Sequence, residues 1–410
     1  MKILMINKFY YIKGGSETYY FALKDLLVRN GHEVIDFSMK DTRNFESKYS
    51  KYFIENIDYN KKQSLIDKIR VAAKIIYSFE AKNKLESLIK QTKPDIAHLH
   101  IFQHQISPSI LDVLKKYNIP IVYTAHDLKM ICPNYKMLSN GEICERCKGG
   151  RYINCIRYKC VKNSFVKSSI NTIEAYFHKY KGSYEIIDKI ITPSEFYRRK
   201  FIEFGVQENK IIHINNFLFE NKCVNKKSVL NDNYIIYFGR LSEEKGIETL
   251  IKGIKNLNID LYIVGTGPLK EKIEKYILEN KISNIKVLGY KAGEELKELV
   301  SSSQAVVIPS EWYENGPYSA IESLSMKKPI IGSNLGGIPE LIEQGYNGYI
   351  FEGKNEESLI EVIKKFLELD EVQRKIMGEN SRNIFMESYT ENGHYKNIIA
   401  IYNSLLKNKS

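Results

Sequence analysis

Short runs of hydrophobic residues alternate along this chain with longer segments that have the periodicity of helices. In the first half the runs lie at residues 2–6, 33–38, 95–100, 120–124, 189–192 and 211–214, and in the second half at 234–238, 260–264, 286–288, 305–309, 329–331 and 349–351. Strands separated by helix-length segments indicate βαβ units and parallel sheets. We therefore predict an α/β fold with two doubly wound parallel-sheet domains in tandem, whose carboxyl-end edges border a cleft.

A polar segment without clear periodicity separates the two series of strands, and it sets the predicted domain boundaries. The first domain covers residues 1–218, the linker 219–232, the second domain 233–388 and a final helical segment 389–410. A length of 410 residues exceeds one ordinary core and fits two domains of roughly 200 residues each. No apolar run is long enough for a signal peptide or a spanning helix, so the expected location is the cytoplasm.

The net charge of +12 indicates an anionic partner. Between Arg146 and Lys200 there are thirteen Lys or Arg residues against four Asp or Glu residues. A solvated basic surface would explain this excess. The functional interpretation is peripheral contact with the inner face of an anionic membrane, or with a lipid-phosphate acceptor.

Charged residues in the second half combine the side chains that a nucleotide diphosphate and a sugar require. Gly239 and Arg240 follow a predicted strand, Lys245 comes five residues later, and Glu314 and Glu322 are eight positions apart. Fixed cations or a helix N-terminus absorb the charge of a leaving diphosphate, whereas carboxylates accept hydrogen bonds from sugar and ribose hydroxyls.

These motifs resemble the nucleotide-sugar glycosyltransferases of glycosyltransferase family 4, group 1, in order and spacing over nearly the whole chain. The resemblance implies the GT-B architecture of two Rossmann-like domains, an acceptor side in the first domain, a donor side in the second, and a last helix, roughly 393–406, that crosses back to the first domain. It also implies that Arg240 and Lys245 hold the donor diphosphate, that Glu314 faces the donor sugar and that Glu322 binds the ribose.

The glycine-containing turns are assigned to donor binding by the same resemblance. Free N–H groups at the helix after Pro317 can bind phosphate or orient the sugar, although Pro317 itself cannot donate. In the sequence Gly265-Thr266-Gly267-Pro268-Leu269-Lys270 the third glycine of a dinucleotide fingerprint is replaced, so a turn that lets a base approach the backbone is the better interpretation. The expected donor-binding residues are Gly14, Gly15, Gly239, Gly265, Gly267, Gly316, Pro317, Tyr318, Ser319 and Glu322.

Histidines at predicted strand ends are the candidates for the catalytic centre. His126, followed by Asp127, matches the family position that reaches the sugar near the reacting carbon, and His100 is the second candidate. The resemblance implies retention of configuration without a protein nucleophile, with the leaving diphosphate taking the acceptor's proton. An inverting enzyme would need a base, and His126 or Asp127 could serve. The predicted catalytic residues are thus His126, Arg240, Lys245 and Glu314.

Cysteines gather in a segment at about residues 130–165 that is not part of the minimal family pattern and resembles a subset of bacterial polysaccharide-type members. Cys144, Cys147, Cys155 and Cys160 have the spacing Cys-x2-Cys-x7-Cys-x4-Cys, with Cys132 upstream. In a cytoplasmic chain such thiols bind metal more often than they form disulfides. Structural zinc is the first choice, an iron–sulfur cluster the second, and unligated thiols the third. No cofactor is expected to be required for catalysis.

The overall prediction is a glycosyltransferase of surface polysaccharide biosynthesis, with a UDP-sugar as the default donor and a glycan or lipid-linked acceptor. The alternative is a zinc-containing nucleic-acid-binding protein, which would use the basic charge and the cysteines but leaves Glu314 and Glu322 unexplained. No nucleic-acid partner is expected for the enzyme. An oxidoreductase is disfavoured by the broken dinucleotide fingerprint.

Overall fold

The computed structural model describes residues 1–56, 65–220 and 233–407, which form two compact units. Unit 1 comprises Met1–Ile214 and Asn392–Ser410, and unit 2 comprises Asn215–Glu391. Most of the predicted linker, 219–232, lies outside the described residues. Residues 215–218 go with unit 2 rather than with the first domain, because the Leu218 N–H donates to the Tyr389 carbonyl at 3.0 Å and the Asn216 amide donates to the Gly316 carbonyl at 3.0 Å.

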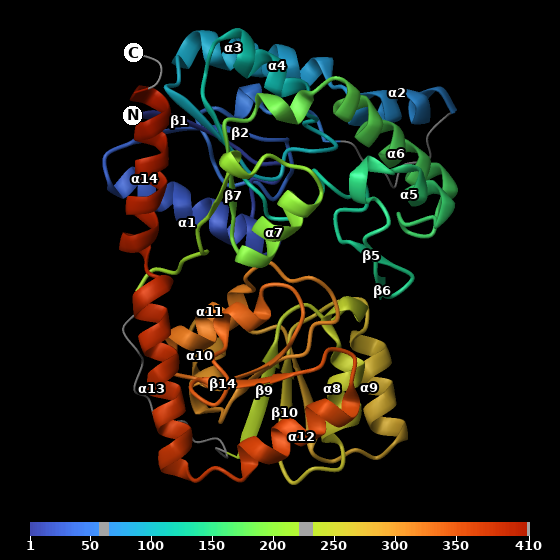
Figure 1. The fold of residues 1–410 in the computed structure, drawn as a ribbon, viewed down its shortest axis with the longest axis vertical. Helices are drawn as coiled ribbons and strands as arrows, with labels where there is room; N and C mark the ends of the chain where they lie inside the picture. The colour runs from blue at the N-terminus through green and yellow to red at the C-terminus, as the bar shows by residue number, and fades with distance from the viewer. Residues whose placement is uncertain (57–64, 221–232, 408–410) are drawn as a thin grey trace. The chain divides into compact units, whose positions relative to one another are not determined.

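Unit 1 is built on a six-stranded parallel sheet in the order β2-β1-β3-β4-β7-β8 (Figure 1). Its strands are β1 (Lys2–Ile6), β2 (Glu33–Phe37), β3 (Ile96–Leu99), β4 (Ile121–Thr124), β7 (Lys189–Thr192) and β8 (Ile211–His213). Its helices are α1 (Gly15–Arg29), α2 (Leu65–Ile76), α3 (Phe79–Thr92), α4 (Ser109–Lys116), α5 (Ile153–Arg157), α6 (Phe165–Tyr180), α7 (Glu195–Glu203) and α14 (Glu391–Lys407).

Unit 2 is built on a second six-stranded parallel sheet, in the order β11-β10-β9-β12-β13-β14. Its strands are β9 (Tyr234–Phe238), β10 (Asp260–Val264), β11 (Ile285–Gly289), β12 (Val306–Ile308), β13 (Ile330–Ser333) and β14 (Gly348–Phe351). Its helices are α8 (Ile247–Ile254), α9 (Lys270–Glu279), α10 (Gly293–Ser302), α11 (Tyr318–Ser325), α12 (Glu356–Leu367) and α13 (Glu371–Ser388).

Every predicted strand is present, because the hydrophobic runs are long enough to be buried on both faces of a parallel sheet. In β9 all five residues are buried, and alternate side chains enter different cores. Ile235 and Tyr237 pack with α8 and α12 residues on one face, whereas Tyr234, Ile236 and Phe238 pack with α11 residues on the other.

The last helix, α14, packs on unit 1. His394, Ile398, Ile401 and Tyr402 are buried on it, and the Tyr402 hydroxyl is 2.6 Å from Nδ1 of His98 in β3. The chain therefore returns to unit 1 after completing unit 2, with the change of unit at Asn392.

The segment between β4 and β7 contains elements that the hydrophobic pattern does not reveal. A small antiparallel hairpin pairs β5 (Leu138–Ser139) with β6 (Glu142–Ile143), and α5 and α6 follow it. This segment carries the cysteines. Its strands of two residues each are too short to produce a periodic signal.

Candidate functional site

In unit 2 the sheet order reverses between β9 and β12, which places two loops at the same carboxyl-end edge. The first two strands after β9 lie on one side of it, and β12 to β14 lie on the other. Open α/β sheets bind ligands outside the carboxyl ends of strands at such a switch point. The loop after β9 carries Gly239, Arg240 and Lys245, and the loop after β12 leads to Glu314.

Lys245 and Glu314 form the central contact of this unit 2 site. The Lys245 ammonium lies 2.5 Å from Oε1 of Glu314, whose side chain is only 7% exposed. The same oxygen accepts hydrogen bonds from the Ser310 hydroxyl at 2.6 Å and the Trp312 indole N–H at 2.8 Å. Burial alone would raise the pKa of Glu314, but the Lys245 charge and these hydrogen bonds outweigh it and lower the pKa. The carboxylate is therefore charged and fixed.

The pKa of Glu322 is raised, whereas that of Glu314 is lowered. Glu322 lies on α11, eight residues after Glu314, and no hydrogen bond or ion pair of its carboxyl group is found with the residues that the structure describes. Burial raises its pKa to about 7. A carboxyl group without a protein partner keeps both oxygens available to hydroxyl donors of a ligand.

Arg240 is exposed, and its side chain makes no ion pair with the described residues. A hydrogen bond fixes its backbone: the Tyr237 hydroxyl donates to the Arg240 carbonyl at 2.8 Å. The structure thus brings Lys245 and Glu314 into direct contact, and it leaves the Arg240 guanidinium available for an anion.

Gly265 and Gly267 serve backbone packing, which the sequence interpretation had not anticipated. A Cβ on Gly265 would lie 1.8 Å from the Gly239 carbonyl oxygen, and one on Gly267 would lie 2.3 Å from that of Leu241. The Leu241 N–H also donates to the Thr266 carbonyl at 2.9 Å. These glycines therefore let the loop after β10 lie directly against the loop that carries Arg240 and Lys245.

The remaining predicted residues of unit 2 shape the entry to α11. Gly316 has a φ of 65°, Pro317 is the N-cap, and Tyr318 and Ser319 form the first turn. The N–H groups of a first helical turn have no partners within the helix, so they face the end where an anion can bind.

Unit 1 has a separate cluster of predicted residues, a stack of histidines at the carboxyl ends of β3 and β4. The ring centroids of His98 and His100 are 4.5 Å apart, and those of His100 and His126 are 5.4 Å apart. Nδ1 of His100 and Nε2 of His126 are 3.1 Å apart. The Tyr19 ring of α1 meets His126 edge-on at 5.1 Å, so the turn beginning at Gly14 and Gly15 lies on the helix that contacts the stack.

Burial determines the charge of this stack. It lowers the pKa of His98 and of His126 to about 3 and that of His100 well below its ordinary value. The three rings are therefore neutral at physiological pH. A neutral imidazole can still donate one hydrogen bond and accept another, so His126 can orient a sugar hydroxyl but cannot supply a cation.

The cysteine segment shows contacts between thiols, and Cys132 belongs with them. Cys132, Cys147 and Cys155 are buried, and Cys147 is within electrostatic range of Cys132, Cys144 and Cys160. Burial raises the pKa of Cys132 to about 11 and that of Cys147 to about 12. The neighbouring Cys155 thiol lowers the pKa of Cys160.

The predicted zinc ligands are not arranged as a metal site. Within residues 1–56, 65–220 and 233–407, no group of three or more His, Cys, Asp or Glu side chains has positions that could hold a metal ion. Five thiols nevertheless share one segment, and thiolates are the ligands that zinc prefers in structural sites. Zinc binding by Cys144, Cys147, Cys155 and Cys160 stays a prediction.

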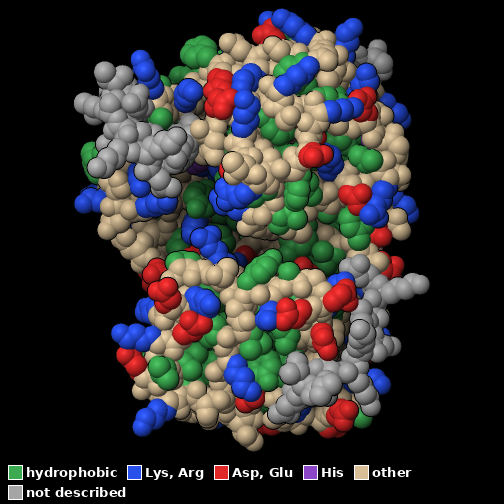
Figure 2. Space-filling view, turned by 180° about the vertical axis from the view of Figure 1, so that it is seen from behind, with side chains coloured by type: hydrophobic (Ala, Val, Ile, Leu, Met, Phe, Trp, Pro, Cys, Tyr) green, Lys and Arg blue, Asp and Glu red, His purple; other side chains and the backbone are tan. Residues whose placement is uncertain are grey.

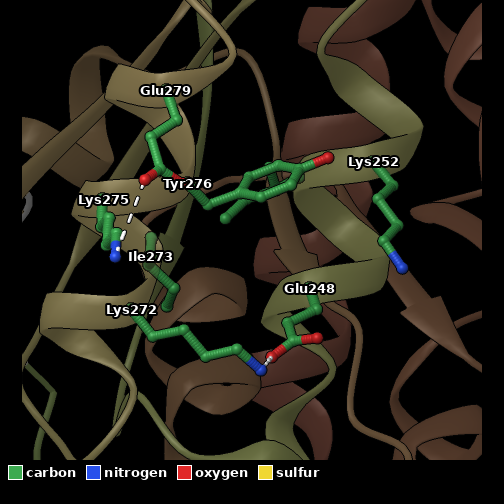
Figure 3. Close-up of a pocket in the computed structure, with 8 residues that line it drawn as sticks. Glu248, Lys252, Lys272, Ile273, Lys275, Tyr276 and Glu279 are labelled. Carbon is green, nitrogen blue, oxygen red and sulfur yellow. Dashed lines mark hydrogen bonds and ion pairs between the residues drawn. The ribbon is translucent and has the colours of Figure 1, made fainter.

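A pocket on unit 2 lies between α8 and α9, and none of its lining residues is a predicted site residue (Figure 3). Two of its three lysines are paired with its two glutamates: Lys272 with Glu248 at 2.6 Å, and Lys275 with Glu279 at 3.7 Å. None of its lining residues comes from a loop at the carboxyl end of a strand. The pocket therefore does not compete with the switch-point site.

Sequence reasoning missed Ser310 and Trp312, the two side chains that donate to Glu314. A signal was present for one of them, because Trp312 is the only tryptophan of the chain and precedes Glu314 by two residues. Ser310 gave no such signal.

Comparisons with known proteins agree with this geometry. Residues 13–218 match the family model described as Glycosyltransferase Family 4, and residues 220–384 match the model described as Glycosyl transferases group 1. A 42.6 kDa protein in the cps region of Klebsiella pneumoniae is 24% identical over 387 residues, which are 92% of this chain and 96% of that protein. The capsular polysaccharide biosynthesis glycosyltransferase CapM of Staphylococcus aureus is 26% identical over 227 residues, or 53% of this chain and 59% of CapM.

Solved structures show the same architecture. Anabaena HepE in complex with UDP-glucose superimposes with a TM-score of 0.66 at 18% identity, covering 98% of this chain and all of HepE, a likeness that shows the fold. The chain has two Rossmann-like units, and the two family models together span nearly the whole sequence. Both observations indicate the same family. The chain belongs to the family 4, group 1 glycosyltransferases and has the GT-B fold.

Proposed function

We propose that this glycosyltransferase transfers a hexose from a UDP-sugar to a glycan or lipid-linked acceptor in surface polysaccharide biosynthesis, with retention of the anomeric configuration. The observation that carries the proposal is the Lys245–Glu314 pair at the β9/β12 switch point. The relatives support the pathway, since one is described as acting in capsular polysaccharide biosynthesis. The neighbour HepE supports the donor class, because it was solved with UDP-glucose.

Lys245 is suited to a diphosphate because its position is set before the ligand arrives. Glu314 uses one of the three ammonium donors, and the other two remain for phosphate oxygens. The exposed Arg240 adds a planar pair of donors on the neighbouring turn. Two fixed cations would stabilise the charge that develops on the leaving group.

The carboxyl groups are suited to the two sugars of the donor. Glu314 has its Oε1 occupied by Lys245, Ser310 and Trp312, so Oε2 is the oxygen that can accept from a donor-sugar hydroxyl. Glu322 has neither oxygen paired within the described chain, which suits the two adjacent hydroxyls of a ribose.

In the proposed reaction the bond between the anomeric carbon and the diphosphate oxygen breaks. The acceptor oxygen forms its bond to the same face of that carbon, and the acceptor's proton passes to the departing diphosphate oxygen. Arg240 and Lys245 stabilise this oxygen, and His126 orients the sugar as a neutral hydrogen-bonding group. No cofactor takes part in this scheme.

A panel of nucleotide sugars tests the donor assignment. UDP-sugars should raise the melting temperature of the protein, since a ligand at 100 times its Kd adds about 2.7 kcal/mol of stability. The anomeric configuration of the product, followed by NMR from the first turnover, tests retention. Stabilisation by GDP- or dTDP-sugars alone would contradict the donor, and an inverted first product would contradict the mechanism. No observation favours the alternative of a nucleic-acid-binding protein.

A further inference from the structure

Helix α6 has its polar residues inside and its apolar residues outside, which is the reverse of an ordinary surface helix. Its buried residues are Ser168, Asn171, Thr172, Glu174 and His178. Its exposed hydrophobic residues are Phe165, Val166, Ile173, Phe177 and Tyr180. Of these, Val166, Ile173, Phe177 and Tyr180 follow one another at intervals of seven, four and three residues, so they line one face of the helix.

The inward polar residues make specific contacts that fix the orientation of α6. Glu174 pairs with the buried Lys129 at 2.8 Å, and Asn171 accepts from the same ammonium at 2.8 Å. His178 is 2.9 Å from the Ser183 hydroxyl and 2.8 Å from the Ile76 carbonyl. Rotating the helix to bury its apolar face would break these contacts. The exposed stripe is therefore a stable property of the folded unit.

The stripe is large and contiguous rather than a scatter of single residues. Ile173 is 54% exposed, Val166 65% and Tyr180 83%. Ile153 on the adjacent α5 is 57% exposed and extends the same surface, because its backbone N–H bonds to the Tyr176 hydroxyl of α6. Contiguous apolar surface on a protein marks an interaction site, whereas isolated hydrophobic residues do not.

Positive charge surrounds this stripe. From Arg151 to Lys181 the sequence has seven Lys or Arg residues and one acidic residue, Glu174, which is buried. Arg157, Lys159, Lys162 and Lys167 are exposed and form no ion pair within the described chain. In the lower half of the face shown in Figure 2, acidic and basic side chains are interspersed. The α5–α6 segment differs in having a strong excess of basic residues.

We infer that the α5–α6 surface docks on an anionic lipid bilayer, with the α6 stripe inserted at the headgroup boundary and the flanking lysines on lipid phosphates. Aliphatic and aromatic side chains with basic neighbours are the composition of an interfacial helix. A second copy of the chain fits less well, because an isologous contact through this surface would bring the unpaired cations Arg157, Lys159, Lys162 and Lys167 close to the same four cations of the other copy. No helix in the described part of the chain is long and apolar enough to cross a membrane, so this contact would be peripheral.

Vesicle sedimentation with the full-length protein tests the inference without any donor or acceptor, so its result is independent of the proposed function. The vesicles are phosphatidylcholine with or without phosphatidylglycerol. We expect binding only to the anionic vesicles, and we expect salt to weaken it. The double variant V166D/I173D should lower the partition coefficient by at least about tenfold, since two charges replace inserted aliphatic groups.

A matched control exists on unit 2. Val372 and Ile376 of α13 are 66% and 55% exposed, nearly the same as Val166 and Ile173, and V372D/I376D should bind as the wild type does. A second pair of variants tests the charge: K159Q/K162Q/K167Q should bind weakly, whereas K252Q/K364Q/K375Q should not differ from the wild type. The lysine variants change only exposed side chains, so they keep the test valid if V166D/I173D fails to fold.

Four outcomes would overturn the inference. The first is equal binding to neutral and anionic vesicles, and the second is wild-type binding by both V166D/I173D and K159Q/K162Q/K167Q. The third is an equal loss of vesicle binding in these variants and in their unit 2 controls. The fourth is a dimer that forms without vesicles and that V166D/I173D dissociates. The last would make the surface an interface between copies.

Discussion

The histidine stack of unit 1 is neutral and the Glu314 carboxylate of unit 2 is charged, although both lie at the carboxyl ends of parallel strands. In unit 1 burial keeps three stacked histidines neutral, and no carboxylate pairs with them among the residues that the structure describes. In unit 2 Glu314 is equally buried, but Lys245, Ser310 and Trp312 keep it ionised. The comparison teaches that burial alone does not set the charge of a site, because the partners decide it.

The largest effect should come from removing the cation of unit 2. Lys245→Ala should lower kcat by about 10²- to 10³-fold, because the variant loses a contact that stabilises the negative charge developing in the transition state. The loss also leaves Glu314 buried without its counter-charge. The measurement is steady-state kinetics with a UDP-sugar. Lys252→Ala, on the exposed face of α8, is the control, and turnover of K245A within a few-fold of wild type would remove the diphosphate assignment.

Removal of metal should have the next largest effect if the thiols of unit 1 hold zinc. Purified protein should contain about one equivalent of zinc, and chelation should lower the melting temperature, because metal binding contributes to folding free energy. Cys147→Ser should lose the metal, whereas Cys132→Ser distinguishes a four-thiol site from one that uses the upstream cysteine. Less than about a tenth of an equivalent of zinc and iron together would mean unligated thiols.

The neutral stack of unit 1 should contribute less than the cation of unit 2. His126→Ala should lower kcat by about tenfold, the lower range for a single hydrogen-bonding group. Because burial lowers the pKa of His126 to about 3, this ratio should be the same at pH 5.5 and pH 8. An effect that vanishes below about pH 6.5 would instead indicate a histidine with an ordinary pKa acting as a base. His32→Ala, near the opposite ends of the strands, is the control.

The sequence predicts the parallel sheets and the loops of the site well, and it predicts the contacts within the site poorly. Runs such as 234–238 are apolar at every position, which is the local signature of a strand buried on both faces. By contrast, the pairing of Lys245 with Glu314 joins residues 69 positions apart and depends on which strands become neighbours. The polar interior of α6 was also hidden, because a helix with one apolar face predicts the same periodicity whether that face is buried or exposed.

The smallest effect should come from Glu322, which sharpens the comparison within unit 2. Its pKa is raised to about 7 by burial, so the folded protein binds a proton between about pH 4.5 and pH 7 that the unfolded chain releases. Stability from this group is therefore present at low pH and is lost as the pH rises through 7. At pH 8 Glu322→Gln should have a free energy of unfolding on the order of 1 kcal/mol larger than that of the wild type and should melt at a higher temperature, whereas at pH 5 the two should melt at nearly the same temperature.

Donor binding should show the opposite trend with pH, since an ionised carboxylate accepts stronger hydrogen bonds from ribose hydroxyls. The affinity of the wild type for a UDP-sugar, whose phosphates do not titrate in this range, should rise between pH 6 and pH 8, and that of Glu322→Gln should be lower and independent of pH. Isothermal titration at the two pH values measures both. A variant with unchanged affinity and unchanged pH dependence would mean that Glu322 does not contact the nucleotide, and the burial of its carboxyl group would then be a cost to stability alone.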